Sequence, residues 1–408
     1  MKHVVLCMLA LAATACHAAP EFSGQVRPQW LDQQASSAGP LAQAVALQPG
    51  IATPPRSEGL IETELRASGH GLNFVGTLQQ QRIEGDRLRS HGWVNELYGA
   101  TDGAGWQLSA GKRIVAWDVG YGFRPNDVVE QEARRTLLSV TAEGRPLLMA
   151  EHFDATTAWS FVLVNPTKPH DQRGAEEPAL AARVYRRDGA VDWHGFARYG
   201  AHTGTSLGGA LAWVATDAIE LHASVRALQR ADTLASDASA NALVSANPWQ
   251  VVSTGRTGQA LIGGTWTNED QLSLLAEAWW DGTALSDAQW DAWNARNRGL
   301  SAYVGTPAPA LAVAGNLAWQ TSAFGASTSL RRTNLFARLS WQHDKWQPSL
   351  DVLFTPADRG RVVTGALGWQ GDRLRIDVGA RFYGGPADAL LAQLPTRRIV
   401  YAAGTWSF

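Results

Sequence analysis

Residues 373–383 show the clearest alternation of side chains in the chain. Every second position is apolar: Leu374, Ile376, Val378, Ala380 and Phe382. The positions between them hold Arg373, Arg375, Asp377, Gly379 and Arg381. Successive side chains of a β-strand point to opposite faces, so this segment predicts a strand with one apolar and one charged face. A charged face cannot lie in a dry core, whereas a wall between lipid and a polar lumen suits both faces.

The same alternation recurs at 217–228, 333–342 and 346–354, although Pro348 interrupts the third segment. A membrane-spanning strand takes about 9–11 residues, and bacterial single-chain barrels use an even number of strands. Dividing the chain by this criterion gives roughly 16–20 strands, with about 18 as the central value. The segmentation conflicts with strand parity near 155–178 and 229–256, so at least one strand there is misplaced. The predicted fold is all-β: a transmembrane antiparallel β-barrel of about 18 strands.

Short turn signals alternate with longer polar or proline-rich segments. The turn signals lie at 68–71, 101–103, 143–144, 188–189, 343–345 and 371–372. The longer segments are 32–57, 118–134, 166–178, 229–249, 282–308 and 384–397. Tight hairpins at one end and longer loops at the other are typical of bacterial outer-membrane barrels.

The first residues have the order of a secretory signal peptide. Lys2 and His3 precede an apolar run from Val4 to Ala15, which is followed by small residues up to Ala19. We expect cleavage after Ala18, which makes 1–18 the signal peptide and 19–408 a single barrel domain. The alternative is a lipoprotein anchored at Cys16, but the preceding Ala-Thr-Ala lacks the leucine that such signals favour.

Composition narrows the possible functions. Both cysteines, Cys7 and Cys16, lie in the expected signal peptide, so the mature chain has no disulfide, thiolate metal site or cysteine nucleophile. Removing Lys2 leaves 34 of the 35 Lys and Arg residues against 37 Asp and Glu, which gives no argument for nucleic-acid binding. The 18 tryptophans suit a membrane interface, or alternatively the aromatic core of a soluble all-β protein.

Catalytic motifs in their usual structural context are not found in the sequence. The histidines lack a short metal-ligand spacing, and there is no phosphate loop or dinucleotide fingerprint. The Gly-x-Ser-x-Gly pattern at 204–208 lies in an alternating, strand-like segment and not at the strand-to-helix elbow that the hydrolase motif needs. We therefore expect no catalytic residue, no metal and no cofactor. A catalytic triad assembled from distant strands stays open, because triads are defined by geometry and not by sequence spacing.

The chain ends in a strand-like segment, 400–408, with Trp406 and Phe408 as its last aromatic residues. This ending resembles the terminal signature of Gram-negative outer-membrane β-barrels. The resemblance implies that the barrel-assembly machinery reads Trp406 and Phe408, and that the last strand closes against the first, expected at 21–31. It also implies the outer membrane as location, with membrane lipid and lipopolysaccharide as surroundings and a periplasmic export system as a further possible partner.

The most distinctive local segment spans about residues 110–135. A basic pair, then Trp117, then a Pro-x-Asp loop resemble the constriction region of alginate-export and hydrophobic-substrate porins. Asp127 is expected to cap a short helix with Glu130, which can pair with Arg134. The resemblance implies an inward loop at 112–135 that narrows the pore, with candidate residues Lys112, Arg113, Arg124, Asp127, Glu130, Arg134 and Arg135. The alternative is a solvated external loop whose charges pair with one another.

Other charged residues fall on the polar faces of predicted strands. The candidates for the lumen wall are His222, Arg226, Arg375 and Arg381. Trp290 and Trp293 follow a capping box at Ser286–Gln289 and share one helical face, which predicts packing at the barrel rim. The sequence thus favours a channel or export porin for a small or extended polar solute. The alternatives are an outer-membrane hydrolase of lipase or protease type, or the barrel partner of a periplasmic export system.

Overall fold

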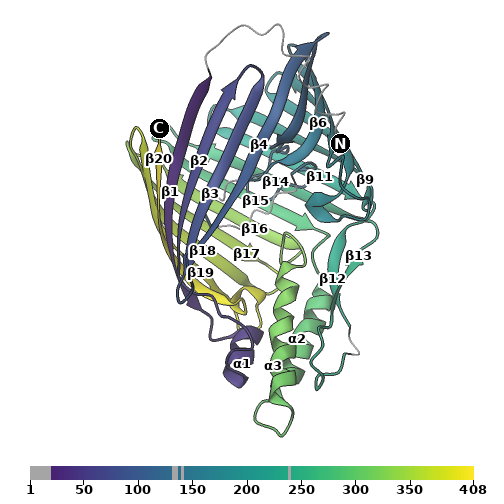
Figure 1. The fold of residues 1–408 in the computed structure, drawn as a ribbon, viewed down its shortest axis with the longest axis vertical. Helices are drawn as coiled ribbons and strands as arrows, with labels where there is room; N and C mark the ends of the chain where they lie inside the picture. The colour runs from purple at the N-terminus through teal and green to yellow at the C-terminus, as the bar shows by residue number, and fades with distance from the viewer. Residues whose placement is uncertain (1–19, 131–136, 139–141, 238–239) are drawn as a thin grey trace.

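The computed structural model describes residues 20–130, 137–138, 142–237 and 240–408. Eighteen antiparallel strands form one sheet that closes on itself, since β1 pairs with both β2 and β20 (Figure 1). The barrel strands are β1 (Glu21–Ala35), β2 (Glu58–Gly69), β3 (Leu72–Ile83), β4 (Arg89–Gly103), β5 (Trp106–Arg113), β6 (Arg145–Phe153), β7 (Thr157–Val164), β8 (Ala179–Asp188), β9 (Val191–Gly200), β10 (Gly204–Thr216), β11 (Ile219–Leu228), β14 (Thr257–Thr267), β15 (Leu272–Asp281), β16 (Thr333–Trp341), β17 (Trp346–Thr355), β18 (Gly360–Gln370), β19 (Leu374–Gly384) and β20 (Thr396–Ser407). The predicted fold class and the central value of 18 strands are confirmed.

The alternation seen in the sequence separates the two faces of the wall. In β19, Ile376 and Val378 each expose 42% of their surface on the outside. On the inner face, Arg381 Nε donates a 2.9 Å hydrogen bond to Thr364 Oγ1 of β18. In β11, Leu221 and Val225 are exposed while His222 and Ser224 are buried. The predicted facing of these strands is confirmed.

The two ends of the barrel differ in the length of their connections. At one end, here called the turn end, every hairpin is short: 70–71, 104–105, 154–156, 189–190, 217–218, 268–271, 342–345 and 371–373. At the opposite end, the loop end, the longest connections are 36–57, 114–144, 165–178, 229–256, 282–332 and 385–395. Two predicted turns are wrong. Residues 101–103 end β4 just before its turn, and 143–144 belong to the long connection between β5 and β6.

The parity conflicts of the segmentation have structural causes. Residues 229–256 contain a separate hairpin, β12 (Asp232–Ser236) and β13 (Trp249–Ser253), which pairs with itself and not with the barrel. Residues 165–178 form a loop with a single 3-10 turn, η1 (Gly174–Glu176). Both segments hold strand-like residues that do not contribute a wall strand, so counting them as spanning strands breaks the parity.

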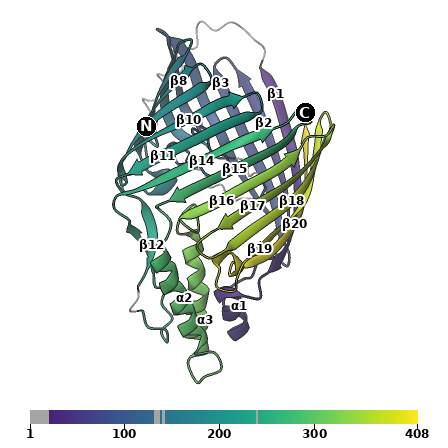
Figure 2. The ribbon, with the colours of Figure 1, turned by 180° about the vertical axis from the view of Figure 1, so that it is seen from behind.

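Helices gather at the loop end beside the β12–β13 hairpin (Figures 1 and 2). They are α1 (Gly39–Leu47), α2 (Asp287–Ser301), α3 (Ala310–Trp319) and the 3-10 turns η2 (Gln320–Gly325) and η3 (Leu390–Ala392). Leu300 of α2 and Leu317 of α3 pack with Ala44 of α1 in a small core. No helix in the described part of the chain is both long and apolar enough to cross a membrane.

The predicted capping box is confirmed, because the side chains and backbones of Ser286 and Gln289 bond reciprocally at the start of α2. The helix ends at Ser301. Trp290 and Trp293 are buried, and each indole donates a 2.9 Å hydrogen bond to a backbone carbonyl. The pair packs against Phe324 and Leu390 at the loop end, as the helical spacing predicted.

Barrel closure joins the two ends of the sequence. β20 pairs with β1 over nearly its whole length, from Gln25 opposite Ser407 to Ala35 opposite Thr396. Gly24 and Phe408 exchange two backbone hydrogen bonds of 3.0 Å each. The first strand extends to Ala35, beyond the expected 21–31. The last residue of the chain therefore takes part in closing the sheet.

Adding a charge to the outer face should destabilise the barrel far more than removing a charge from the inner face. We expect Ile376→Arg or Val378→Arg to lower the free energy of unfolding in a bilayer by about 2–4 kcal/mol, because an arginine would face hydrocarbon. Arg375→Ile on the inner face is the matched control and should leave the barrel folded. Denaturant unfolding in lipid vesicles measures both. A harmless Ile376→Arg with an unfolded Arg375→Ile would show that the facing is inverted.

The terminal aromatic residue should matter for assembly. Deleting Phe408 removes two backbone hydrogen bonds to Gly24 and a ring that lies 5.6 Å from that of Trp406. We expect less heat-modifiable, surface-exposed barrel, with export across the inner membrane unchanged. Phe408→Tyr, which keeps the ring and the backbone, should assemble normally. Normal membrane levels of the truncated chain would rule out this role for Phe408.

Candidate functional site

The connection between β5 and β6 enters the barrel. Trp117, Val128 and Val129 are buried against Leu147 and Phe196, which belong to the inner face of the wall from β6 to β10. This contact is apolar, so the segment and the wall shield one another from water. Residues 114–130, here called the inward segment, thus line the inside of the barrel.

The predicted helix after Asp127 is only partly within the described residues. Val128–Glu130 form a turn, while 131–136, with Arg134 and Arg135, lie outside the described residues. The helix and the pairing of Glu130 with Arg134 stay predictions.

Asp118 fixes the first bend of the inward segment. One carboxylate oxygen accepts a 2.5 Å hydrogen bond from the backbone N–H of Asn126, which closes residues 118–126 into a loop. Ser224 of β11 donates to the same carboxylate at 2.8 and 3.0 Å. Asp118 has a φ of +107°, a strained value for a side chain other than glycine, and these bonds hold it there. Burial raises the pKa of Asp118, and the hydrogen bonds from Asn126 and Ser224 oppose this rise.

A glycine in the wall lets the segment approach closely. Asn126 Nδ2 donates to Ser224 Oγ at 2.8 Å and to the backbone carbonyl of Val225 at 3.1 Å. A Cβ at Gly208 of β10 would lie 2.8 Å from Cγ of Asn126, too close for any side chain. Gly208 therefore makes room for Asn126 against the wall.

Glu277 of β15 holds the far side of the segment. Its two oxygens accept hydrogen bonds from the backbone N–H groups of Tyr121 at 2.6 Å and Gly122 at 2.7 Å. Oε1 also lies 3.0 Å from His222 Nε2, while His222 Nδ1 lies 3.1 Å from Glu220. The side chain of Glu277 is fully buried. One carboxylate thus joins the inward segment to two strands of the wall.

Aromatic contacts complete the attachment. Phe123 stacks on Trp279 of β15 with ring centroids 5.7 Å apart, and Tyr121 stacks on Phe336 of β16 at 5.8 Å. Arg338 donates a 2.5 Å hydrogen bond to the hydroxyl of Tyr121. Because polar and aromatic contacts act together, the segment is held at several points along the wall from β11 to β16.

Paired charges cover inner faces that the inward segment does not touch. In β1 and β2, Arg27 lies 3.4 Å from Glu62 and 3.3 Å from Glu64, and Arg66 lies 2.7 Å from Glu64. In β19, Arg375 pairs with Asp377 at 2.7 Å. Paired charges of both signs make these walls polar without a large net charge.

The residues predicted from the sequence to line the constriction or the lumen have different partners in the structure. Lys112 pairs with Glu143, Arg113 with Glu151 at 3.4 Å, and Arg124 Nε donates to the carbonyl of Gly120 at 2.9 Å. Asp127 and Glu130 are buried. The lumen candidates contact inner-face or inward-segment groups: His222 with Glu277, Arg226 with Pro125, Arg375 with Asp377 and Arg381 with Thr364. Their role in solute passage stays a prediction.

Sequence reasoning missed the residues that anchor the segment. Glu277 is the only charged residue between Leu272 and Trp280, and such a lone carboxylate in an apolar strand was a usable signal. Asp118 is one of several charges in its loop, and Gly208 is one of several small residues in its strand, so neither stands out in the sequence. Within the described ranges, no three His, Cys, Asp or Glu side chains gather in a way that could hold a metal ion.

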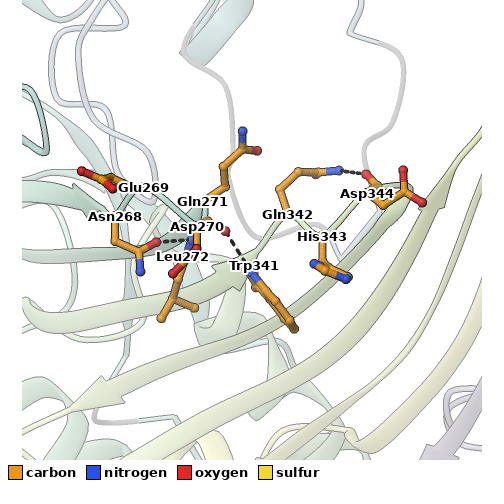
Figure 3. Close-up of a pocket in the computed structure, with 9 residues that line it drawn as sticks. All are labelled: Asn268, Glu269, Asp270, Gln271, Leu272, Trp341, Gln342, His343 and Asp344. Carbon is orange, nitrogen blue, oxygen red and sulfur yellow. Dashed lines mark hydrogen bonds between the residues drawn. The ribbon is translucent and has the colours of Figure 1, made fainter.

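A separate open hollow of about 780 Å³ lies at the turn end (Figure 3). Its lining comes from residues 268–272 and 341–344, which belong to two neighbouring turns and the adjoining strand ends. Trp341 Nε1 donates a 3.0 Å hydrogen bond to the carbonyl of Asp270 across it. The inward segment contributes no residue to this hollow.

The wall is a closed antiparallel sheet that is apolar outside and polar inside. A long connection folds into its lumen. The structure is thus a closed antiparallel β-barrel of 18 strands. Two engineered variants of the porin of Rhodopseudomonas blastica, each 10% identical, align over 95% of this chain and 100% of their own, with TM-scores of 0.46 and 0.45. No protein-family description and no curated protein matches the chain.

Removal of the Glu277 charge should loosen the inward segment of this barrel. We expect Glu277→Gln to increase hydrogen exchange at the amides of Tyr121 and Gly122 by about tenfold or more, because hydrogen bonds to a charged group contribute about 1.5–3 kcal/mol. Mass-spectrometric hydrogen exchange of the folded barrel measures this. The matched control is Glu220→Gln, since Glu220 contacts His222 but not the segment. Unchanged protection in Glu277→Gln would show that other contacts hold the segment.

Proposed function

We propose that this barrel is a channel in the outer membrane of a Gram-negative bacterium, through which a small or extended polar solute passes. The observation that carries the proposal is the division of the wall into an apolar outer and a charged inner face. Leu207 and Ile262, for example, expose 59% and 65% of their surface outwards, while Glu62 and Glu64 are buried inside. Such a wall is stable in lipid and offers polar groups to a solute.

The tryptophans support the membrane setting. Nine of those in the described residues are exposed: Trp30, Trp159, Trp193, Trp213, Trp266, Trp280, Trp341, Trp346 and Trp406. A soluble protein with an aromatic core would bury them, whereas the membrane interface favours amphipathic rings. Short turns face the periplasm in outer-membrane barrels, so the turn end is assigned to the periplasm and the helices to the exterior.

The hydrolase alternative finds little support in His222, the histidine most deeply placed in the wall. Both ring nitrogens of His222 face carboxylates, Glu220 on one side and Glu277 on the other. Neither nitrogen is free to accept a proton from a serine nucleophile, as the base of a triad must. His222 instead connects two carboxylates near the inward segment.

The local field beside the inward segment should govern ion selectivity. We expect the triple change of Arg124, Arg134 and Arg135 to Ala to shift the reversal potential in a planar bilayer towards cations, because Asp118, Asp127 and Glu130 remain. A narrow passage of low dielectric amplifies such local charges. The measurement is single-channel conductance and reversal potential of the purified barrel under a salt gradient.

A control with the same change in net charge separates local from global effects. Arg87, Arg256 and Arg298 are exposed and lie outside the inward segment. Changing these three to Ala should leave selectivity close to that of the unchanged barrel. An unchanged reversal potential in the folded Arg124, Arg134 and Arg135 variant would show that these charges lie outside the conducting path. Absence of conductance in the unchanged barrel would overturn the channel itself, and conductance only with a periplasmic partner would favour the export role.

A further inference from the structure

A polar cavity of about 220 Å³ lies at the loop-end side of the inward segment. The inward segment, β9, β10 and β11 contribute to its lining, together with residues of the connection between β15 and β16. Four of its charged lining residues are arginines: Arg124, Arg198, Arg226 and Arg230. Two are acids, Asp127 and Asp232. The cavity is therefore rich in guanidinium groups.

Arg226 has only neutral partners at its guanidinium group. Nε and Nη2 donate to Ser206 Oγ at 3.2 and 2.9 Å, and Nη1 donates to the carbonyl of Pro125 at 3.0 Å. In the described part of the chain, no carboxylate oxygen lies within 4.0 Å of the Arg226 or Arg230 guanidinium. The carboxylates of Asp127 and Asp118 act on the Arg226 guanidinium only from beyond that distance. A closer anion in the cavity would therefore stabilise this buried cation further.

The carboxylate of Glu177 is already bound by another arginine, Arg198. Arg198 lies directly opposite Ser206 in the β9–β10 pairing, so Arg198 and Arg226 flank the same serine. Glu177 pairs with Arg198 at 2.8 Å and accepts the backbone N–H groups of His202 and Thr203 at 2.6 Å each. Burial raises the pKa of Glu177, but Arg198 and the Thr203 N–H outweigh it and hold that pKa below its usual value. Glu177 is thus charged, and its oxygens already bind Arg198 and the backbone N–H groups of His202 and Thr203.

Asp232 is likewise engaged at the rim of the cavity. Its Oδ1 lies 2.9 Å from His202 Nε2 and 3.9 Å from Arg173. Glu177 and Asp232 thus each have partners other than Arg226 and Arg230.

We propose that this cavity is a binding subsite for a small oxyanion, a carboxylate or phosphate group of the passing solute, held by Arg226 and Arg230. The planar fork of an arginine matches both groups in a bidentate manner. Arg230 is exposed and meets the anion first, and Arg226 holds it beside Ser206. The assignment rests on the proposed channel, because it names the chemical class of the solute.

Direct binding tests the subsite without requiring conductance. Isothermal titration of the detergent-purified barrel with succinate, and separately with inorganic phosphate, should show binding, while the uncharged solute glycerol should not bind. We expect Arg226→Gln and Arg230→Gln each to weaken binding by about tenfold or more, which is the loss expected for one charge-assisted hydrogen bond. The matched control is Arg256→Gln, an exposed loop-end arginine outside the cavity, which should bind as the unchanged barrel does.

Two results would overturn the subsite. One is the absence of binding of both anions to the folded, unchanged barrel, and the other is equal binding by all three Gln variants. If Arg226→Gln does not fold, as judged by heat-modifiable migration, the exposed Arg230→Gln decides the question. A barrel that binds these anions but never conducts would contradict the channel and leave the subsite standing, so the two failures are distinguishable.

Discussion

The closure of β20 on β1 is the interaction on which the rest of the structure depends. In lipid, an unpaired strand edge would leave a row of backbone N–H and C=O groups without partners, so a sheet is stable only when its ends meet. Pairing from Gln25 to Ala35 satisfies this requirement, and Phe408 extends it by two further bonds. Once the wall is closed, its outer face must be apolar, and the polar groups of its inner face must have hydrogen-bond or ionic partners.

Eighteen strands enclose enough space for a segment of the chain itself. The inward segment occupies part of that space. Residues of the wall form hydrogen bonds with its buried polar groups. Glu277 satisfies two backbone N–H groups, and Ser224 satisfies both Asp118 and Asn126. The segment divides the inner wall into a covered side, β6 to β16, and a side whose paired charges stay uncovered.

Much of the wall could be predicted because its physics is local. The alternation at 373–383 and 217–228 fixes which side chains face outwards, since strand periodicity needs no knowledge of neighbouring strands. The candidate site could be predicted only in part. Lys112, Arg113 and Arg124 were recognised as a charged group, but their partners Glu143, Glu151 and Gly120 follow from the path of the connection.

By itself, the sequence determined the barrel class, the facing of its strands and the segment most worth attention, because these depend on residue type and short-range period. Only the tertiary structure decided that 229–256 forms its own hairpin and that Glu277 and Asp118 anchor the inward segment. It alone brought Arg226 beside Arg198 without a carboxylate of its own. Tyr121 and Glu277 are 156 residues apart, and such contacts arise from strand order around a closed wall, which no local pattern encodes.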